Sequence, residues 1–570
     1  MIVSGFLNKN KVILGVIFLI LIGAFLRFYN LNWGAPFYFH PDERNIATAV
    51  TQLRFPEQMS PHFFAYGSLP IYIIYFTGLI VNVFTNFSAT HLPTEVEALV
   101  GFEHAIIIGR AYSALLSTLL IPLLFFLGKK IKDTNLGLLV AFLATFSTGF
   151  IQFAHFGTFE MWLTFFTTLL FWLCLRTVRK RTVSNIFLLA LVSGILVATK
   201  ISHLVILPLP VIAILSKDFQ YYRSLFKARH KKNEEAISLH LQRFAKIIIC
   251  LLFFAAVSIA VYFLTNPYVI FDYQSFLSSM KYESDLASGS LPVFYTQGFY
   301  DTIPIVFQFN RVFPFIINPL LTSIFLPAFF YVIFLAIKKR VIGYQLLVIS
   351  FLLIFLPQAF LFAKWTRYMV PTLPFIYLII SIVVLKLLLR FKKVLSIKYL
   401  VFSIILISSI VFSLSYFITA FTQPDTRIAA GEFVKLNVPD DSKSLTEPYD
   451  LGAMAFNSHL PTIYHFNFYD LDPNNAVLEE ELRARSSESE YIILPSQRLL
   501  KSRLLNKNKY PRGHTFYSNL TNGQLGFQKI YETPCDLTCK VAYLGDPIFS
   551  FEETATVFDR PTVFIYKKIQ

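Results

Sequence analysis

The chain has 570 residues, of which 55% are hydrophobic, 17% aromatic and only 15% charged, and its mean hydropathy is +0.58. So apolar a composition excludes an ordinary soluble globular protein and indicates a multi-pass membrane protein. The net charge of +16 does not indicate a nucleic-acid partner, because the basic residues form short runs between apolar segments, as they do in cytoplasmic loops of membrane proteins.

The first apolar segment, residues 12–29, is long enough to cross the hydrocarbon core and follows Lys9 and Lys11. We expect an uncleaved first span with a cytoplasmic N-terminus, because the run is too long for a signal peptide and no small-residue cleavage site follows it. Further spans are predicted at 105–128, 135–153, 159–175, 185–199, 203–216, 246–265, 314–336, 343–363, 369–389 and 399–421. The total is about eleven transmembrane helices.

The apolar stretch 69–84 is not counted as a span because of where the basic runs lie. These runs are at 129–132, 176–181, 217–246, 338–340 and 390–398. They are all cytoplasmic only if 69–84 does not cross the membrane. We therefore predict an interfacial helix at 69–84 within one long external loop at 30–104. The alternative is that 69–84 spans and several loops break the positive-inside rule.

The composition becomes polar and rich in turns after the last predicted span. Residues 1–421 hold the spans and a second sizeable external loop at 266–313, whereas 422–570 contains short β-like runs at 490–494 and 562–566. About 150 residues are enough for a domain with its own core. Eleven spans from a cytoplasmic N-terminus place this mixed α/β domain on the extracytoplasmic side.

Two residue pairs in the polar domain carry weak signals. Cys535 and Cys539 form either a disulfide in an oxidising compartment or an adventitious pair. Asp470 and Asp472 have the D-x-D pattern with which nucleotide-sugar transferases hold a metal. Nucleotide sugars are not normally available outside the cytoplasm, so we do not assign that role.

Asp42 and Glu43 lie next to each other just after the first span. Two carboxylates beside a membrane edge indicate a catalytic acid or base. Acidic residues in the first turn of a helix that starts at Pro41 are an equally simple explanation.

Other ionisable residues fall on the same external side by the count of spans. They are Arg27, Arg110, His155, Glu160, Lys200, Lys364 and Arg367. A charge at the centre of a membrane segment costs about 2.5–3.5 kcal/mol, so each needs a partner, a cavity or an interfacial position. Snorkelling explains any single Arg27, Arg110 or Lys200, whereas convergence of several indicates a shared cavity.

Carboxylates with Lys and Arg at a membrane boundary suit an anionic, lipid-anchored phosphate. The cations stabilise the phosphate as a leaving group while a carboxylate takes a proton from an incoming hydroxyl. A proton-coupled transporter would more often place its charges near the bilayer midplane. No Walker A or G-x-G-x-x-G pattern is present. A divalent metal is left open, because the histidines and carboxylates show no fixed ligand spacing.

These features together resemble the GT-C superfamily of lipid-carrier-dependent glycosyltransferases. The motifs are Asp42-Glu43 after the first span, Glu160 in an external turn, Thr199-Lys200, and Arg367-Tyr368 followed by Met-Val-Pro. The resemblance covers about residues 10 to 421 in order. It is strongest to the protein O-mannosyltransferases of glycosyltransferase family 39 and to the bacterial aminoarabinose transferase.

The resemblance implies roles for individual residues. Asp42 matches the catalytic base, Glu43 a supporting or metal-facing group, and Glu160 a second acidic position where the family usually has Asp. The groups implied in carrier-phosphate binding are Lys200, Lys364, Arg367, Tyr368, Arg27, Arg110 and His155. The loop at 266–313 resembles the mobile substrate loop of the family.

The implied activity is transfer of a sugar from a polyprenyl-phosphate carrier to a protein, lipid or glycan hydroxyl at the extracytoplasmic face, with inversion. The implied location is a multi-pass position in the plasma membrane. Two other functions are considered. An oligosaccharyltransferase has a similar first half, but its Trp-Trp-Asp motif is absent from 422–570, since all four tryptophans precede residue 422. The second is a non-enzymatic flippase or transporter of lipid-linked sugars.

Overall fold

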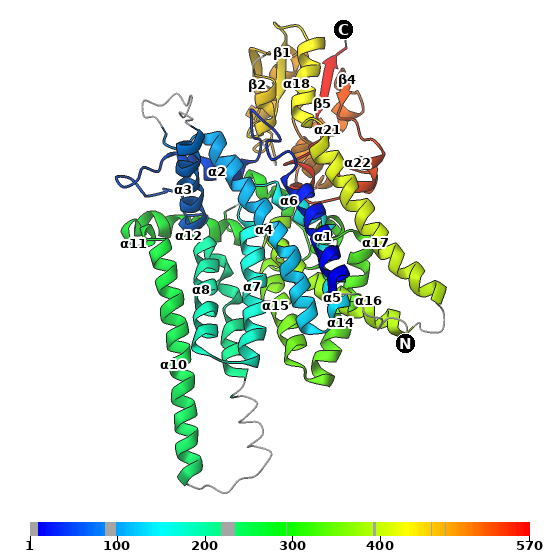
Figure 1. The fold of residues 1–570 in the computed structure, drawn as a ribbon. Helices are drawn as coiled ribbons and strands as arrows, with labels where there is room; N and C mark the ends of the chain where they lie inside the picture. The colour runs from blue at the N-terminus through cyan, green and yellow to red at the C-terminus, as the bar shows by residue number, and fades with distance from the viewer. Residues whose placement is uncertain are drawn as a thin grey trace.

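The computed structural model describes residues 9–85, 98–216, 218, 234–291, 293–390, 395–457, 459–472 and 475–569. A bundle of long helices makes up most of the molecule, and a smaller domain built around a β-sheet sits on one end of the bundle (Figure 1). We call the domain end the upper end, as it is drawn in Figure 1.

The helices of the bundle follow the apolar segments of the sequence. They are α1 (Lys9–Phe28), α4 (Phe102–Ile131), α5 (Thr134–Thr145), α6 (Thr148–Ala154), α7 (Glu160–Arg179), α8 (Val183–Thr199), α10 (Glu234–Thr265), α14 (Pro319–Lys339), α15 (Ile342–Ala359), α16 (Leu373–Arg390) and α17 (Leu395–Phe417). Within the described residues, eight helices are long and apolar enough to cross a membrane, or nine if α5 and α6 form one bent span. Helix α8 and the stretch Ile201–Ser216 are apolar but shorter. The predicted eleven crossings therefore stay a prediction.

The predicted span 135–153 is broken into α5 and α6, which are bent by 54° relative to each other. The Ser147 hydroxyl accepts a hydrogen bond from the Phe150 amide and caps α6. It also accepts a 2.7 Å hydrogen bond from the Tyr377 hydroxyl of α16. A single capping side chain thus starts a new helix inside an apolar run.

A second group of helices covers the upper end of the bundle. They are α2 (Pro41–Thr51), α3 (Ser68–Thr85), η1 (Ile201–Ile206), α11 (Tyr268–Phe271), α12 (Tyr273–Ser288), η2 (Phe294–Phe299), η3 (Gln308–Val312), α13 (Phe313–Ile316), η4 (Thr366–Thr372) and η5 (Ile418–Thr422). Helix α3 coincides with the predicted helix at 69–84 and contacts α2, α4 and α8. Its place in the membrane interface stays a prediction.

The upper domain contains a mixed five-stranded sheet in the order β2-β1-β3-β5-β4. The strands are β1 (Lys443–Thr446), β2 (Thr462–His465), β3 (Tyr491–Leu494), β4 (Phe527–Glu532) and β5 (Phe564–Lys568). Strand β1 is parallel to β2 and β3, whereas β5 is antiparallel to β3 and β4. The β-like runs predicted at 490–494 and 562–566 correspond to β3 and β5, and the mixed α/β class is confirmed.

The sheet has helices on both faces. Ile492 and Leu494 pack with α19 (Ala476–Glu488), α20 (Arg498–Leu505) and α21 (Pro511–Thr521), while Tyr491 and Ile493 pack with α18 (Thr426–Asn437). Alternate residues of a strand point to opposite faces, so both sides of β3 are buried.

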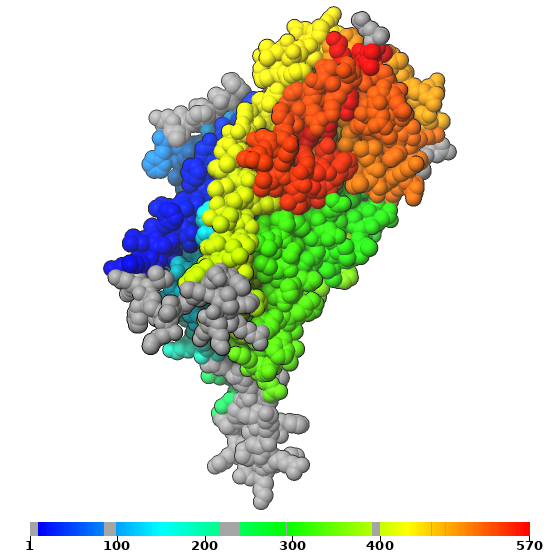
Figure 2. All heavy atoms as spheres, turned by 90° about the vertical axis from the view of Figure 1, so that its right-hand side faces the viewer, coloured from blue at the N-terminus to red at the C-terminus, as the bar shows by residue number. Residues whose placement is uncertain are grey.

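The last part of the chain attaches the domain to the bundle. Helix α22 (Leu537–Ala542) and helix α23 (Glu553–Thr556) bring Tyr543, Phe551 and Ala555 into the hydrophobic core of the bundle. Figure 2 shows these late, orange-to-red residues seated directly on the green part of the bundle.

Candidate active site

A cavity of about 480 Å³ lies between the upper end of the bundle and the domain. The bundle side contributes Asp42, Tyr66, Lys200, Glu283 and Arg367, and the domain side contributes Arg427, Asp450, Arg498 and Glu553. The cavity is therefore lined by charged groups from chain segments that are several hundred residues apart.

Asp42 and Arg367 form the central ion pair of this cavity. Asp42 is in the first turn of α2 and Arg367 is in η4, and both side chains are partly exposed to the cavity. Burial alone would raise the pKa of Asp42, but the charge and hydrogen bond of the Arg367 guanidinium, together with the nearby His40 and Lys200, outweigh burial and hold that pKa below its usual value. Asp42 is thus ionised at neutral pH, and Arg367 Nε has no hydrogen-bond partner among the residues that the structure describes.

Lys200 lies beside the Asp42–Arg367 pair, at the end of α8. Its Nζ is 4.6 Å from the ring centroid of Tyr66 and 5.6 Å from that of Tyr368. Burial, followed by the Arg367 charge, lowers the pKa of Lys200. Among the described residues Lys200 forms no ion pair, so an anion in the cavity would be its natural partner.

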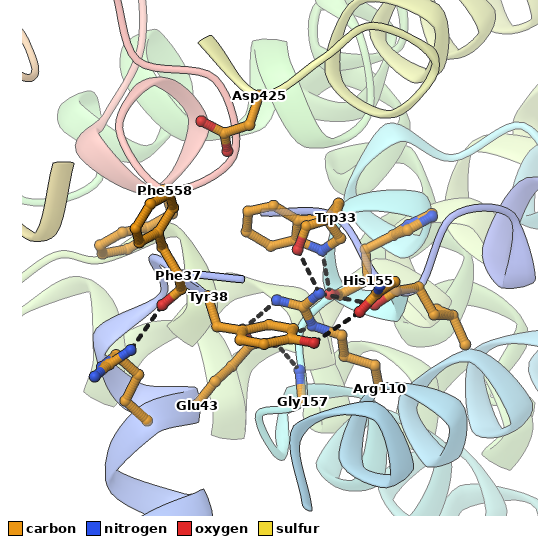
Figure 3. A network of polar contacts seen from close by, with 12 residues as sticks. Trp33, Phe37, Tyr38, Glu43, Arg110, His155, Gly157, Asp425 and Phe558 are labelled. Carbon is orange, nitrogen blue, oxygen red and sulfur yellow. Dashed lines mark hydrogen bonds and ion pairs between the residues drawn. The ribbon is translucent and has the colours of Figure 1, made fainter. Parts of the chain in front are cut away.

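Glu43 points away from the cavity although it is adjacent to Asp42. Successive residues of a helix are rotated by about 100°, so the two carboxylates of α2 face different surroundings. Glu43 accepts hydrogen bonds from Arg110 Nε at 2.9 Å, Arg110 Nη2 at 2.6 Å and the Gly157 amide at 2.5 Å (Figure 3). Both side chains are fully buried, and Arg110 also packs over the Trp33 ring at 4.3 Å. This pair joins α2 to α4 and the turn after α6.

Five other candidates are not among the residues that line the cavity: Arg27, Glu160, His155, Lys364 and Tyr368. Tyr368 flanks it, with its ring centroid 5.6 Å from Lys200 Nζ. Arg27 is fully buried and donates to Ser117 Oγ and to three backbone carbonyls. His155 stacks on Phe421 at 3.6 Å and bonds to the carbonyls of Ile151 and Tyr29.

Lys364 is buried and donates to the Phe362 carbonyl at 3.2 Å. Glu160 begins α7 and is buried, and one of its carboxylate oxygens lacks a hydrogen-bond partner within the described part of the chain. Because their contacts are internal, Arg27, Arg110, His155 and Lys364 are not included among the phosphate ligands proposed below.

The domain side of the cavity carries two ion pairs that the sequence did not reveal. Arg498 of α20 pairs with Glu553 of α23, and Arg427 pairs with Asp425 at 2.6 Å. Arg427 also lies 4.0 Å from the ring centroid of Phe39, immediately before α2. No local motif marks these residues, since only the docking of the domain brings them to the cavity.

The loop at 266–313 contributes a carboxylate and aromatic rings to the cavity. Glu283 lines it from α12 and has a pKa that burial raises above the usual value. Tyr282 and Tyr295 share a 2.8 Å hydrogen bond between their hydroxyls, and the Tyr295 ring contacts the Trp365 ring, with 6.2 Å between the ring centroids. A single acidic residue in a helical loop gave no signal that could be recognised in the sequence.

The described residues contain no group of three or more His, Cys, Asp or Glu that could hold a metal ion. Asp472 instead caps α21, since its carboxylate accepts from the amides of Arg512 and Gly513, and Asp470 accepts from Asn467. Cys535 and Cys539 form a disulfide beside α22.

No protein-family model and no curated protein matches the chain. The apo oligosaccharyltransferase of Archaeoglobus fulgidus is similar over 99% of this chain and 89% of its own, with 11% identity and a TM-score of 0.51. ArnT of Cupriavidus metallidurans bound to undecaprenyl phosphate is similar over 88% and 95%, with 10% identity and a TM-score of 0.44. The S. cerevisiae Pmt1-Pmt2 complex is similar over 48% of this chain and 35% of its own, with 14% identity and a TM-score of 0.31. The first likeness confirms the fold class predicted from the sequence.

Proposed function

We propose that this chain, which has a GT-C type fold, is a membrane glycosyltransferase that moves a sugar from a polyprenyl-phosphate carrier to an acceptor hydroxyl. The observation that carries the proposal is the convergence of Asp42, Lys200 and Arg367 in one cavity. An ionised carboxylate and two cations in one cavity at the end of the helix bundle provide a proton acceptor and a site that stabilises a departing phosphate.

The reaction is a single displacement at the anomeric carbon of the sugar. The acceptor oxygen forms a bond to that carbon, and its proton passes to the Asp42 carboxylate. The bond between the anomeric carbon and the phosphate oxygen breaks, and the electron pair leaves with the phosphate. Lys200 and Arg367 stabilise the negative charge that grows on the leaving phosphate, and the attack from the opposite side inverts the configuration.

The Asp42–Arg367 pair links carrier binding to basicity. In the ligand-free structure the guanidinium stabilises ionised Asp42. A phosphate that engages Arg367 takes part of this stabilisation away, and its own negative charge disfavours ionised Asp42 as well. Both effects raise the pKa of Asp42 and make it a stronger base when the donor is bound.

The charge distribution supports an extracytoplasmic position for this cavity. The lower end of the bundle carries Lys129 and Lys130 at the end of α4, Arg176 and Arg179 at the end of α7, and Lys338 and Lys339 at the end of α14. The positive-inside rule places such ends in the cytoplasm, together with the start of α1. The domain is at the other end (Figure 1), and the cavity lies between it and the bundle.

An oligosaccharyltransferase-like reaction is the second candidate, because the archaeal oligosaccharyltransferase resembles nearly the whole chain in fold. A likeness in fold at 11% identity does not identify the acceptor. The absence of tryptophan after Trp365 in the sequence, and with it of a Trp-Trp-Asp motif, favours a hydroxyl acceptor.

Asp42→Asn is the discriminating variant, and the assay is transfer from a radiolabelled polyprenyl-phosphate sugar in proteoliposomes. The variant keeps the side-chain volume but loses the base, so we expect transfer to fall by about 10² to 10⁴-fold. Asp42→Asn with the wild-type rate refutes the assignment of the base. Wild-type protein that moves lipid-linked sugars across the bilayer, but transfers none of them, refutes the enzyme in favour of the flippase.

The upper domain is proposed to position the acceptor, because Asp450, Arg498 and Glu553 form one side of the cavity. Arg498→Gln breaks its ion pair with Glu553 at the domain side while leaving Asp42 and Lys200 in place. We expect a higher KM for the acceptor with little change for the donor. An unchanged acceptor KM would remove this role.

A further inference from the structure

A second cavity, of about 310 Å³, lies at the lower end of the bundle, opposite to the candidate active site. The ends of α4 and α7 and the start of α8 form it. We call it the basic groove, and it is lined by Lys130, Arg176, Arg179, Lys180, Thr182, Ser184 and Asn185. Four of these seven side chains are cationic and the other three are polar.

Within the part of the chain that the structure describes, none of the four cations forms an ion pair. Two carboxylates near these basic runs are engaged with other cations, since Asp218 pairs with Arg181 and Asp133 pairs with Lys132. The cations are also held together, because Arg179 Nη2 donates to the Lys130 carbonyl at 3.0 Å. Neighbouring positive charges without a counterion repel one another, so an anion bound between them would be stabilising.

The Trp172 ring fixes two of the cations on one side of the basic groove. Lys130 Nζ is 4.8 Å and the Arg176 guanidinium is 5.8 Å from its centroid. Stacked cations lose less side-chain entropy when they bind a ligand, because their orientation is already restricted. Basic residues that only mark the cytoplasmic side of a membrane protein do not need such an arrangement.

The start of α8 adds backbone donors to the basic groove. Helix α8 has 17 residues, and of the N–H groups in its first turn the Asn185 amide donates to the Thr182 hydroxyl that caps the helix. The remaining first-turn N–H groups and the helix dipole favour an anion at this position. Asn185 is 3% exposed and donates from Nδ2 to the Lys180 carbonyl, which holds the turn before α8 in place.

We propose that the basic groove binds a phosphate group. Arg and Lys side chains around a helix N-terminus provide the planar donors, point charges and backbone amides that phosphate oxygens accept. The phosphate can belong to an anionic lipid headgroup of the adjacent leaflet or to a free phosphate ion. This site is separate from the carrier phosphate at Lys200 and Arg367, and it does not depend on the proposed transferase activity.

The test uses the full-length purified protein and two probes. The first arm measures by native mass spectrometry how much phosphatidylglycerol, against phosphatidylcholine, stays bound. The second arm measures thermal unfolding with increasing inorganic phosphate, at constant ionic strength. The test variant is Arg176→Gln/Lys180→Gln, whose side chains make no hydrogen bond within the described residues. The control is Lys338→Gln/Lys339→Gln, which removes the same charge at the end of α14, outside the basic groove.

We expect wild type to retain phosphatidylglycerol over phosphatidylcholine and the test variant to bind it at least tenfold more weakly, with the control within twofold of wild type. That result identifies a lipid headgroup. Stabilisation by inorganic phosphate that only the test variant loses identifies a free phosphate site instead, which also supports the proposal. Equal losses in both variants, or no preference for either phosphate probe, overturn it. If the double variant fails to fold, Lys180→Gln alone decides, and unchanged binding in that variant overturns the proposal.

Discussion

Glu43→Gln tests whether Glu43 stabilises the fold through its ion pair with Arg110, whereas the adjacent Asp42 acts in the cavity. The carboxylate accepts three hydrogen bonds of 2.5–2.9 Å from fully buried donors, two of them from Arg110. The amide can still accept through its oxygen, but its NH2 group faces donors and the Arg110 charge is left without a counterion. Breaking a buried ion pair costs about 3–5 kcal/mol, and we expect about 3 kcal/mol because one acceptor remains. That is a large share of the roughly 5–15 kcal/mol that keeps a typical protein folded.

The assay is thermal unfolding of the detergent-solubilised protein, followed by tryptophan fluorescence, since Trp33 packs directly on Arg110. Glu57→Gln is the matched control, because Glu57 is an exposed carboxylate in the same segment that forms no ion pair among the described residues. We expect Glu43→Gln to lower the unfolding temperature and Glu57→Gln to leave it unchanged. Full stability of Glu43→Gln with loss of sugar transfer would refute the structural role and make Glu43 part of the chemistry.

Three further predictions concern the cavity and the domain. Glu552 accepts a hydrogen bond from the Thr366 amide at 3.0 Å and so orients the turn that carries Arg367. Glu552→Ala should lower kcat about tenfold because Arg367 is then misplaced, and Glu552→Gln, which can still accept that bond, should restore it. Equal losses of kcat in both variants would argue against a positioning role. The pH profile of kcat/KM should fall on its acid side below pH 3.8, the usual pKa of an Asp carboxyl, because Arg367 lowers the pKa of Asp42 in the free enzyme. The profile of kcat should fall at a higher pH, because bound phosphate competes for Arg367. If both profiles fall at the same pH, this coupling is contradicted. Burial raises the pKa of Glu447 to about 8, so the folded state holds a proton that the unfolded state releases near 4.5, and stability should fall as pH rises from about 4.5 to 8. Glu447→Gln should flatten that slope in thermal unfolding at pH 5 to 8, and an unchanged slope would assign it to other groups.

Hydrophobicity was enough to locate the helices of the bundle, because each apolar run has to bury its backbone polar groups in a helix. The break between α5 and α6 could not be predicted in the same way. It depends on the Ser147 hydroxyl, which caps a helix and meets Tyr377 from a segment 230 residues later. A serine in an apolar run is common, and its partner is known only after the helices pack.

The site was predictable for residues that a membrane topology alone brings together. Lys200 and Arg367 line the cavity with Asp42, as their common side indicated. Arg27 and Arg110 share that side as well, but they neither snorkel nor face the cavity, because buried carbonyls and a carboxylate satisfy them. A count of spans gives the side of the membrane on which a residue lies, whereas the direction of its side chain depends on packing.

The segment at 549–559 fastens the domain to the helix bundle at the cavity. Arg311 donates to the Phe549 carbonyl, Thr366 donates to Glu552, and the Asp559 carboxylate accepts from Gln152 at 3.0 Å. Glu553, Val557 and Phe558 of the same segment line the cavity. Removal of this segment would therefore leave the helices of the bundle in place but open the cavity on one side, so the bundle without the domain would not provide the complete site.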